Sequence, residues 1–105
     1  MYIVVYVTAK STREANKIAE ACVKEKLVAC ANVIKGMSSV FWWDGKINRE
    51  SETLVVMKSQ KKLFKRIQAT VKKNHSYVVP EIIAVPIADG NLEYFNWIRQ
   101  STKVS

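Results

Sequence analysis

Five extended apolar runs, interrupted by two stretches with helical periodicity, most constrain how this chain can fold. Residues 2–7 are β-branched and aromatic, which is typical of a strand buried on both faces. Residues 27–34 and 82–87 predict two further strands. Residues 39–43 and 53–57 are joined through Asp44-Gly45, a strong hairpin signal, and therefore predict a long antiparallel ribbon.

The intervening stretches predict two long amphipathic helices. Ser11 and Glu14 have the spacing of a capping box, so we expect the first helix to begin there. Its apolar positions recur at helical spacing and are Ala15, Ile18, Ala19 and Cys22. Residues 60–73 predict the second helix, with an apolar stripe of Leu63, Ile67 and Val71 and a stop at Asn74. Asn91 is expected to cap a short last helix that carries Leu92, Phe95 and Ile98.

With the runs 27–34 and 39–43 counted as one bent strand, the resulting order is β-α-β-β-α-β-α, which predicts one α+β domain over residues 1–105. Two right-handed crossovers that share one antiparallel sheet give a ferredoxin-like βαββαβ sandwich with an extra short C-terminal helix, and place both long helices on one face. Pro86 should lie at an edge or a strand end. The other sheet face is also apolar and one short helix cannot hide it, so we expect an oligomer interface there.

The composition narrows the cell compartments and the binding partners that we expect for this protein. The 49% of hydrophobic residues suffices for one modest core, and no run approaches the roughly 18 apolar residues that cross a bilayer. With no leader-like segment at the start, we expect a cytoplasmic protein whose two cysteines are reduced. The 17 basic and 9 acidic residues give a charge of +8, which favours non-specific attraction to nucleic acid or anionic surfaces.

Three blocks in register resemble the CutA family, known for divalent-cation tolerance. They are residues 27–32 (Leu-Val-Ala-Cys-Ala-Asn), 39–47 (Ser-Val-Phe-Trp-Trp-Asp-Gly-Lys-Ile) and 75–82 (His-Ser-Tyr-Val-Val-Pro-Glu-Ile). The resemblance covers nearly the whole chain. It implies a tight homotrimer with packed sheets and a fold like that of PII signalling trimers. It also implies a protein without enzymatic activity that can bind a divalent cation, such as copper or zinc, without requiring one.

His75 and Cys30 are the candidate metal ligands. A copper-binding member of the CutA family uses a cysteine at the end of the first strand and two successive histidines, and these positions here are Val7, Asn74 and His75. His75 could instead cap the second helix, and Cys30 could simply pack in its strand. We expect Cys22, on an apolar helix stripe, to lie in the core. Since no C-x-x-C or H-x-x-x-H spacing occurs, any site should be sparse or shared between subunits.

A ligand cleft between subunits is predicted from the remaining polar family positions. The candidate residues are Trp43, Glu52, Lys58, Tyr77 and Glu81. Such a mixture suits a small anionic or metal-chelated ligand, and it could equally form an ion-pair network between subunits. Because Trp42 and Trp43 are adjacent on an extended segment, their rings should face opposite sides, with one entering the core or a neighbouring subunit.

The sequence gives less support to a catalytic function or a nucleic-acid-binding function. The chain has no G-x-S-x-G motif and no phosphate-binding loop. An RRM shares the predicted topology but stacks bases on aromatic side chains of its sheet, and residues 53–57 contain none. The prediction is therefore a metal-tolerance trimer that binds metal ions, with a PII-like small-ligand trimer as the alternative and a basic RNA-binding module as a less favoured one.

Overall fold

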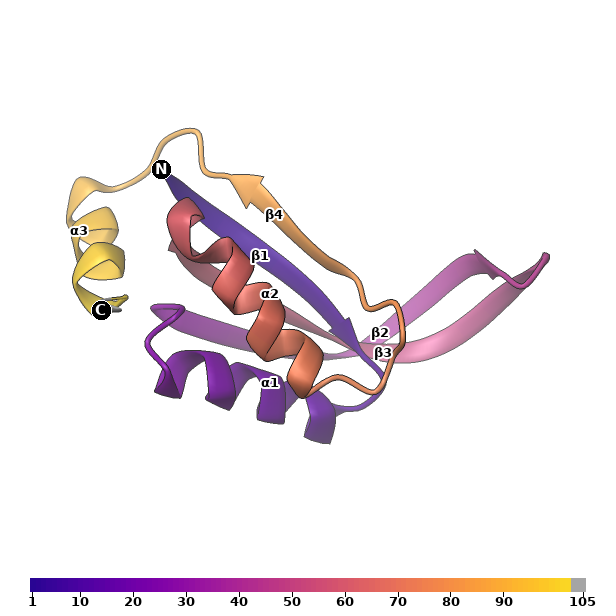
Figure 1. The fold of residues 1–105 in the computed structure, drawn as a ribbon. Helices are drawn as coiled ribbons and strands as arrows, with labels where there is room; N and C mark the ends of the chain where they lie inside the picture. The colour runs from indigo at the N-terminus through magenta and orange to yellow at the C-terminus, as the bar shows by residue number, and fades with distance from the viewer. Residues whose placement is uncertain (103–105) are drawn as a thin grey trace.

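A computed structural model of the chain, which describes residues 1–102, contains one four-stranded antiparallel sheet and three α-helices (Figure 1). In chain order the elements are β1 (Tyr2–Ala9), α1 (Thr12–Lys24), β2 (Cys30–Trp43), β3 (Lys46–Gln60), the 3₁₀ turn η1 (Lys61–Leu63), α2 (Phe64–Lys73), β4 (Ile82–Pro86) and α3 (Leu92–Ser101). The strand order β2-β3-β1-β4 is ferredoxin-like, as predicted. The predicted domain ends at residue 105, and residues 103–105 lie outside the described part.

The core lies between one sheet face and the two long helices. Because strand side chains alternate between faces, Ile3, Val5 and Val7 of β1 all point toward the helices and are buried. Ile18 of α1 and Ile67 of α2 close this layer from the other side. Figure 1 shows α1 and α2 side by side on the same face of the sheet.

The predicted helix stripes are confirmed, and the helix starts differ in detail. Ser11 caps α1, since its hydroxyl accepts the backbone N–H of Glu14 at 3.1 Å. The Glu14 carboxylate does not return to Ser11 and instead accepts the N–H of Lys10 at 3.4 Å, so the expected reciprocal capping box is only half formed. The second helix opens with η1 before α2 begins at Phe64.

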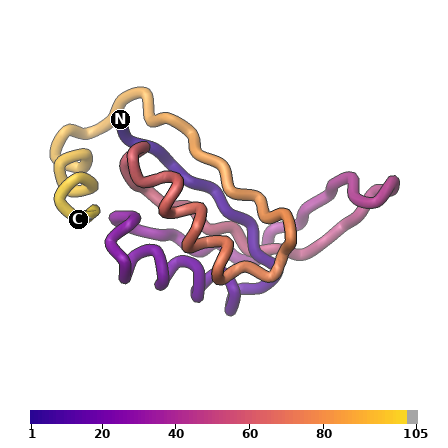
Figure 2. Tube along the Cα trace, viewed as in Figure 1, coloured from indigo at the N-terminus to yellow at the C-terminus, as the bar shows by residue number. Residues whose placement is uncertain are grey.

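The β2–β3 ribbon is longer and more continuous than predicted. The run 27–34 does not form a strand from its start, because Lys26 adopts a left-handed φ of 59° and the chain becomes paired only near Cys30. The strand also does not end at Ile34, where the predicted run ends: Gly36, at φ 81°, lies in a register shift between Ile34 and Met37, and β2 continues beyond it. Beyond that shift, residues 37–52 pair only with one another, and Figure 2 shows the ribbon projecting from the rest of the molecule.

The two adjacent tryptophans lie at the tip of this ribbon. Trp42 is 73% exposed and Trp43 is 58% exposed. The expectation that one ring enters the core of the chain is therefore wrong, because the ribbon tip lies beyond the helical layer. A neighbouring subunit is the remaining means of covering either ring.

Helix α3 covers only one end of the second sheet face. Asn91 caps it, as predicted, by accepting the N–H groups of Glu93 and Tyr94. Phe95 stacks on Tyr2 of β1 with ring centroids 4.5 Å apart. The rest of this face is called the open face below. Its apolar residues are Val4, Tyr6, Ile34, Leu54, Val56, Ile83 and Val85, and Cys30, Asn32 and Lys58 lie on the same face.

Candidate functional site

Two polar clusters lie at opposite ends of β1. The first, called the His75 cluster, contains Thr8, Glu14, Glu52, His75 and Tyr77. It forms where the loop after α2 turns back past the end of β1, close to the point at which the ribbon leaves the sheet (Figure 2). The second cluster lies at the start of β2.

His75 is the centre of the first cluster. Its Nε2 lies 2.7 Å from the carbonyl oxygen of Thr8, and its Nδ1 accepts the backbone N–H of Tyr77 at 3.1 Å. In these bonds Nε2 donates to the carbonyl group and Nδ1 accepts, so each ring nitrogen has a partner. The side chain is only 1% exposed. A metal ion would have to displace one of these partners, so the cluster does not present a vacant imidazole nitrogen.

The hydrogen bonds of His75 also decide whether its side chain caps the C-terminus of α2. Its backbone N–H contacts the carbonyl of Lys72 at 3.4 Å, at the end of α2. The ring, however, reaches β1 rather than the carbonyl groups of α2. The side chain of Asn74 donates to the carbonyl of Thr70 and performs the capping instead. His75 therefore joins α2 to β1.

Carboxylates surround this histidine. Glu14 Oε1 lies 3.6 Å from the His75 Nδ1, and Glu14 Oε2 accepts the N–H of Ser76 at 3.0 Å. Burial raises the pKa of Glu14, but hydrogen bonding from Ser76, the nearby His75 and the N–H of Lys10 outweigh it and hold the pKa below its ordinary value. Glu14 is therefore a carboxylate at neutral pH.

Tyr77 and Glu52 form a partly buried pair. The phenol of Tyr77 donates to Glu52 Oε2 at 2.8 Å. Burial, the bond to Glu52 and the charges of Glu52, Glu14 and Glu50 together raise the pKa of Tyr77 to about 12. The phenol thus stays protonated at neutral pH and acts as a donor, which is suited to holding a carboxylate and not to general-base chemistry.

The second cluster, called the Cys30 cluster, contains Cys30, Asn32, Lys58 and Tyr94. Cys30 Sγ lies 3.6 Å from the hydroxyl of Tyr94, and Lys58 donates to Asn32 Oδ1 at 2.6 Å. Burial, together with the bond to Cys30, raises the pKa of Tyr94. The arrangement is partly exposed and offers a thiol, an amide and an ammonium group on the open face.

Cys22 has a different environment from Cys30. It is fully buried in the core, as predicted. Burial and the nearby Glu25 raise the pKa of its thiol to about 12. A thiol that stays protonated is a poor nucleophile and metal ligand, so the chemistry of Cys22 is packing.

The predicted site residues are thus only partly brought together. Glu52 and Tyr77 touch, whereas Lys58 lies six residues further along β3, a separation of about 20 Å. Cys30 and His75 fall into different clusters. Trp43 lies at the ribbon tip, and Glu81 is exposed just before β4. Among residues 1–102, no group of three or more His, Cys, Asp or Glu side chains is placed to hold a metal ion.

Some residues of both clusters were not predicted from the sequence. Thr8 contributes a backbone carbonyl, which any residue could supply, so no sequence pattern could reveal it. Glu14 was expected to cap a helix, a role that uses the same carboxylate. Asn32 belongs to a block that carries the family resemblance, and its location in that block was the available indication. Tyr94 lies outside the three blocks.

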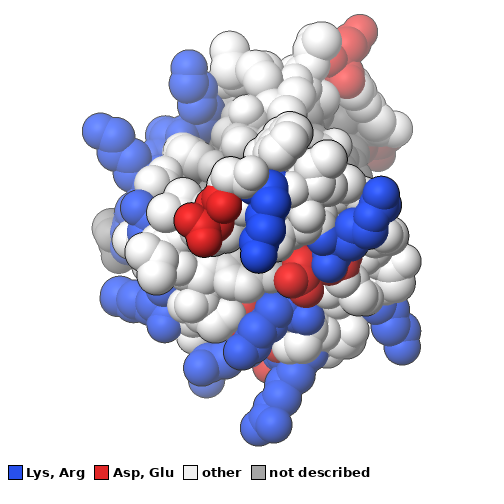
Figure 3. Space-filling view, turned by 90° about the vertical axis from the view of Figure 1, so that its right-hand side faces the viewer, with Lys and Arg blue, Asp and Glu red and all other residues white. Residues whose placement is uncertain are grey.

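Basic side chains are widely distributed over the surface. Lys61, Lys62, Lys65, Arg66, Lys72 and Lys73 are all exposed. On the face in Figure 3, lysine and arginine side chains lie along the left, lower and right sides and near the middle, with fewer acidic groups among them. The charge therefore does not gather into a single strip on this face.

Comparison with known proteins gives consistent results over almost the whole chain. A model of the family described as CutA1 divalent ion tolerance protein matches residues 3–101. A rice protein, "Protein CutA 1, chloroplastic", is 43% identical over 103 residues, which is 98% of this chain and 58% of that protein. The chain thus spans little more than half the length of that relative.

Solved structures show the same fold. The divalent cation tolerance protein Cut A1 from Thermus thermophilus has a TM-score of 0.96 and 41% identity, covering 98% of this chain and 100% of that one. A structure from Archaeoglobus fulgidus, named as a periplasmic divalent cation tolerance protein CutA, has a TM-score of 0.95 and 37% identity, with coverage of 98% and 100%. These matches confirm the ferredoxin-like prediction.

The predicted cytoplasmic location is contradicted by these relatives. One is named chloroplastic and another periplasmic, so the folded domain does not determine the compartment. The prediction used the composition of the domain and the lack of a leader-like segment at the start, and neither property of the folded core determines the compartment. None of the helices within residues 1–102 combines the length and the apolar character needed to cross a membrane.

Proposed function

Because this chain belongs to the CutA1 divalent ion tolerance family, we propose that it acts in divalent-cation tolerance as a homotrimer. In this proposal, copper or another divalent ion, or a small ligand, binds in clefts between subunits. No catalytic step is part of the proposal.

The observation that carries the proposal is the open face. Ile34, Ile83 and Val85 are each between 44% and 51% exposed on one side of the sheet, next to half-buried Val4 and Val56. Monomeric proteins rarely leave so continuous an apolar surface in water. The exposed ribbon tip, with Trp42 and Trp43, adds a second surface of the same kind. Closed packing of identical subunits would cover both.

Site geometry supports placing the ligand between subunits. Within one chain the donor atoms are separated: the Cys30 cluster and the His75 cluster lie at opposite ends of β1, and Trp43 lies far out on the ribbon. Packing of subunits could bring the ribbon of one chain to a polar cluster of the next. Copper binding is then expected to be weak in any isolated protomer, with the partly exposed thiol of Cys30 as one soft donor.

Specific nucleic-acid binding is not part of the proposal. The six basic residues of η1 and α2 lie in the helical layer, whereas an RRM uses its sheet face. We expect any RNA binding to be independent of sequence and to weaken steeply with salt.

The oligomeric state can be tested by light scattering on the intact chain and on two variants. Ile34→Glu places a charge on the open face and should shift the mass from a trimer toward the 12.0 kDa protomer. Val23→Glu is the matched control, because Val23 is exposed on α1 in the helical layer. A wild-type chain that is a stable monomer at micromolar concentration contradicts the proposal.

Metal binding needs a separate measurement. Calorimetric titration with copper and with zinc is expected to give weak binding that Cys30→Ser reduces. His75→Ala should have a smaller effect on binding, since both ring nitrogens are occupied. Submicromolar copper affinity that is unchanged in both variants would place the metal site elsewhere.

A further inference from the structure

A groove on the helical side of the sheet has no role in the proposed function. It lies between η1, the start of α2 and the edge strand β4, and has a volume of about 620 Å³. Its lining residues are Met1, Ile3, Lys61, Lys62, Phe64, Lys65, Ala84 and Pro86. The groove exists because α2 covers β1 while Ala84 and Pro86 on the neighbouring β4 remain exposed.

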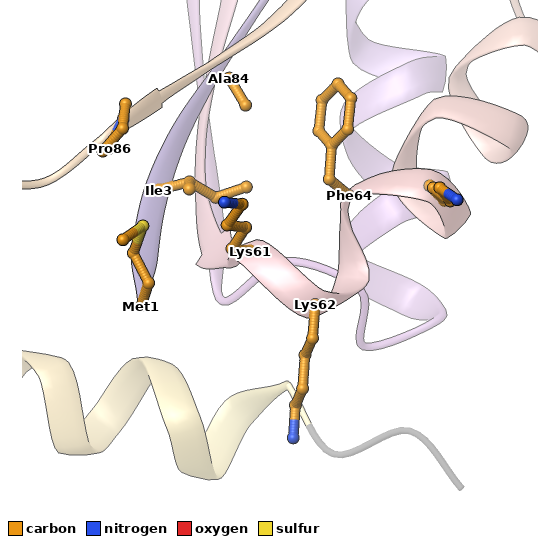
Figure 4. A pocket seen from close by; sticks show the side chains of 8 residues that line it. Met1, Ile3, Lys61, Lys62, Phe64, Ala84 and Pro86 are labelled. Atoms are coloured by element: carbon orange, nitrogen blue, oxygen red, sulfur yellow. The ribbon is translucent and has the colours of Figure 1, made fainter.

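The groove has an apolar wall on each side and basic groups around it. Figure 4 shows Phe64 on the α2 side and Pro86 and Met1 on the other. Lys61 extends toward Ile3 between them, whereas the Lys62 side chain points away from these walls. Three of the eight lining residues are lysines and none is acidic. An uncharged apolar ligand would gain nothing from these lysines, which are called the lysine rim below.

The position of the lysines is unfavourable for the helix itself. The first turns of η1 and α2 contain no acidic residue, and neither helix has a side-chain cap. Positive charge near a helix N-terminus opposes the helix dipole, which prefers anions there. The lysines therefore do not stabilise α2, and an anion in the groove would relieve both the dipole and their mutual repulsion.

We propose that this groove binds a free single-chain amphiphile with one anionic head group, of the long-chain carboxylate class. Its hydrocarbon chain would lie between Phe64 and Pro86, and its head would contact the lysine rim. The volume is within the range of small-molecule sites.

The test is calorimetric titration of the intact protein with dodecanoate at concentrations below its aggregation limit. Dodecanol, which lacks the charge, and acetate, which lacks the chain, are the comparison ligands. We expect saturable binding of dodecanoate and none of the other two. Lys61→Glu with Lys65→Glu should weaken dodecanoate binding at least about tenfold. Ala84→Trp, which fills the groove from an exposed position, should do the same.

The matched control is Lys72→Glu with Lys73→Glu, the same charge change at the other end of α2. It should leave dodecanoate binding within about twofold of the wild type. If the reversed lysines disturb folding, seen by circular dichroism, Lys61→Gln with Lys65→Gln replaces them. Equal loss in the control, equal binding of dodecanol, or no binding of dodecanoate would overturn the proposal. Binding of anionic vesicles alone, unaffected by Ala84→Trp, would also overturn it and would indicate a membrane surface.

Discussion

His75→Ala is the perturbation that best separates a structural from a metal-binding histidine. The ring holds the carbonyl of Thr8 and the N–H of Tyr77, at 2.7 and 3.1 Å, in a place where the side chain is 1% exposed. Its removal leaves two backbone groups without these partners. Each such group costs about 1–3 kcal/mol, and entry of water into the vacated space should recover part of the sum. We therefore expect the free energy of unfolding to fall by about 2–4 kcal/mol.

The assay is urea denaturation at one fixed protomer concentration, with a chelator present, since association and metal binding would both change the apparent stability. His75→Gln, which keeps an amide that can donate to Thr8, should lose less than His75→Ala. Lys73→Ala, exposed on α2, is the control and should change little. A loss below about 0.5 kcal/mol in His75→Ala, together with a tenfold fall in copper affinity, would refute the structural role.

Three further results are expected. The pKa of Glu14 is lower in the folded state than its ordinary value of 4.5, so its ionised carboxylate stabilises the fold above that value, and this stabilisation is lost as the pH falls through the folded pKa. Glu14→Gln should therefore reduce the dependence of the unfolding free energy on pH in this acid range. The exposed Glu20→Gln should not. Ser59→Ala removes a buried 2.6 Å bond to the carbonyl of Leu27 and should cost about 1–2 kcal/mol by urea denaturation. Cys22, which is fully buried in the core, should react with a thiol reagent only on unfolding; reaction of Cys22 in the native state at the rate of the unfolded chain would contradict the assigned burial.

The parts of the fold that follow from periodicity could be predicted from the sequence. Leu63, Ile67 and Val71 recur at helical spacing and are all buried. The ribbon was also predictable, because Asp44-Gly45 specifies its turn. Boundaries set by single backbone conformations could not be read in this way. Lys26 adopts a left-handed φ that delays β2, although lysine carries no preference for that region.

The site was less predictable than the fold, since its contacts join elements far apart in the chain. The bond from His75 to Thr8 spans 67 residues, and its acceptor is a backbone group. Glu52 and Lys58 are six residues apart on β3, so Glu52 pairs with Met37 in the ribbon whereas Lys58 pairs with Cys30 at the start of β2. A residue list derived from a family resemblance therefore mixes positions that one chain does not bring together.

The ribbon connects the stability of the chain to its proposed function. Residues 37–52 pair only with one another, and an isolated two-stranded ribbon is marginally stable in water. This ribbon nevertheless has Val40, Trp42, Trp43 and Ile47 exposed, each above 50%. Such side chains would favour collapse or aggregation in a lone protomer, and they stabilise the ribbon only when another surface covers them. Glu52 lies at the root of the ribbon and Trp43 at its tip, so contact between ribbons and neighbouring subunits would determine both the stability of the ribbon and the shape of any cleft. This is the physical reason to seek the ligand of this protein in the assembly rather than in one chain.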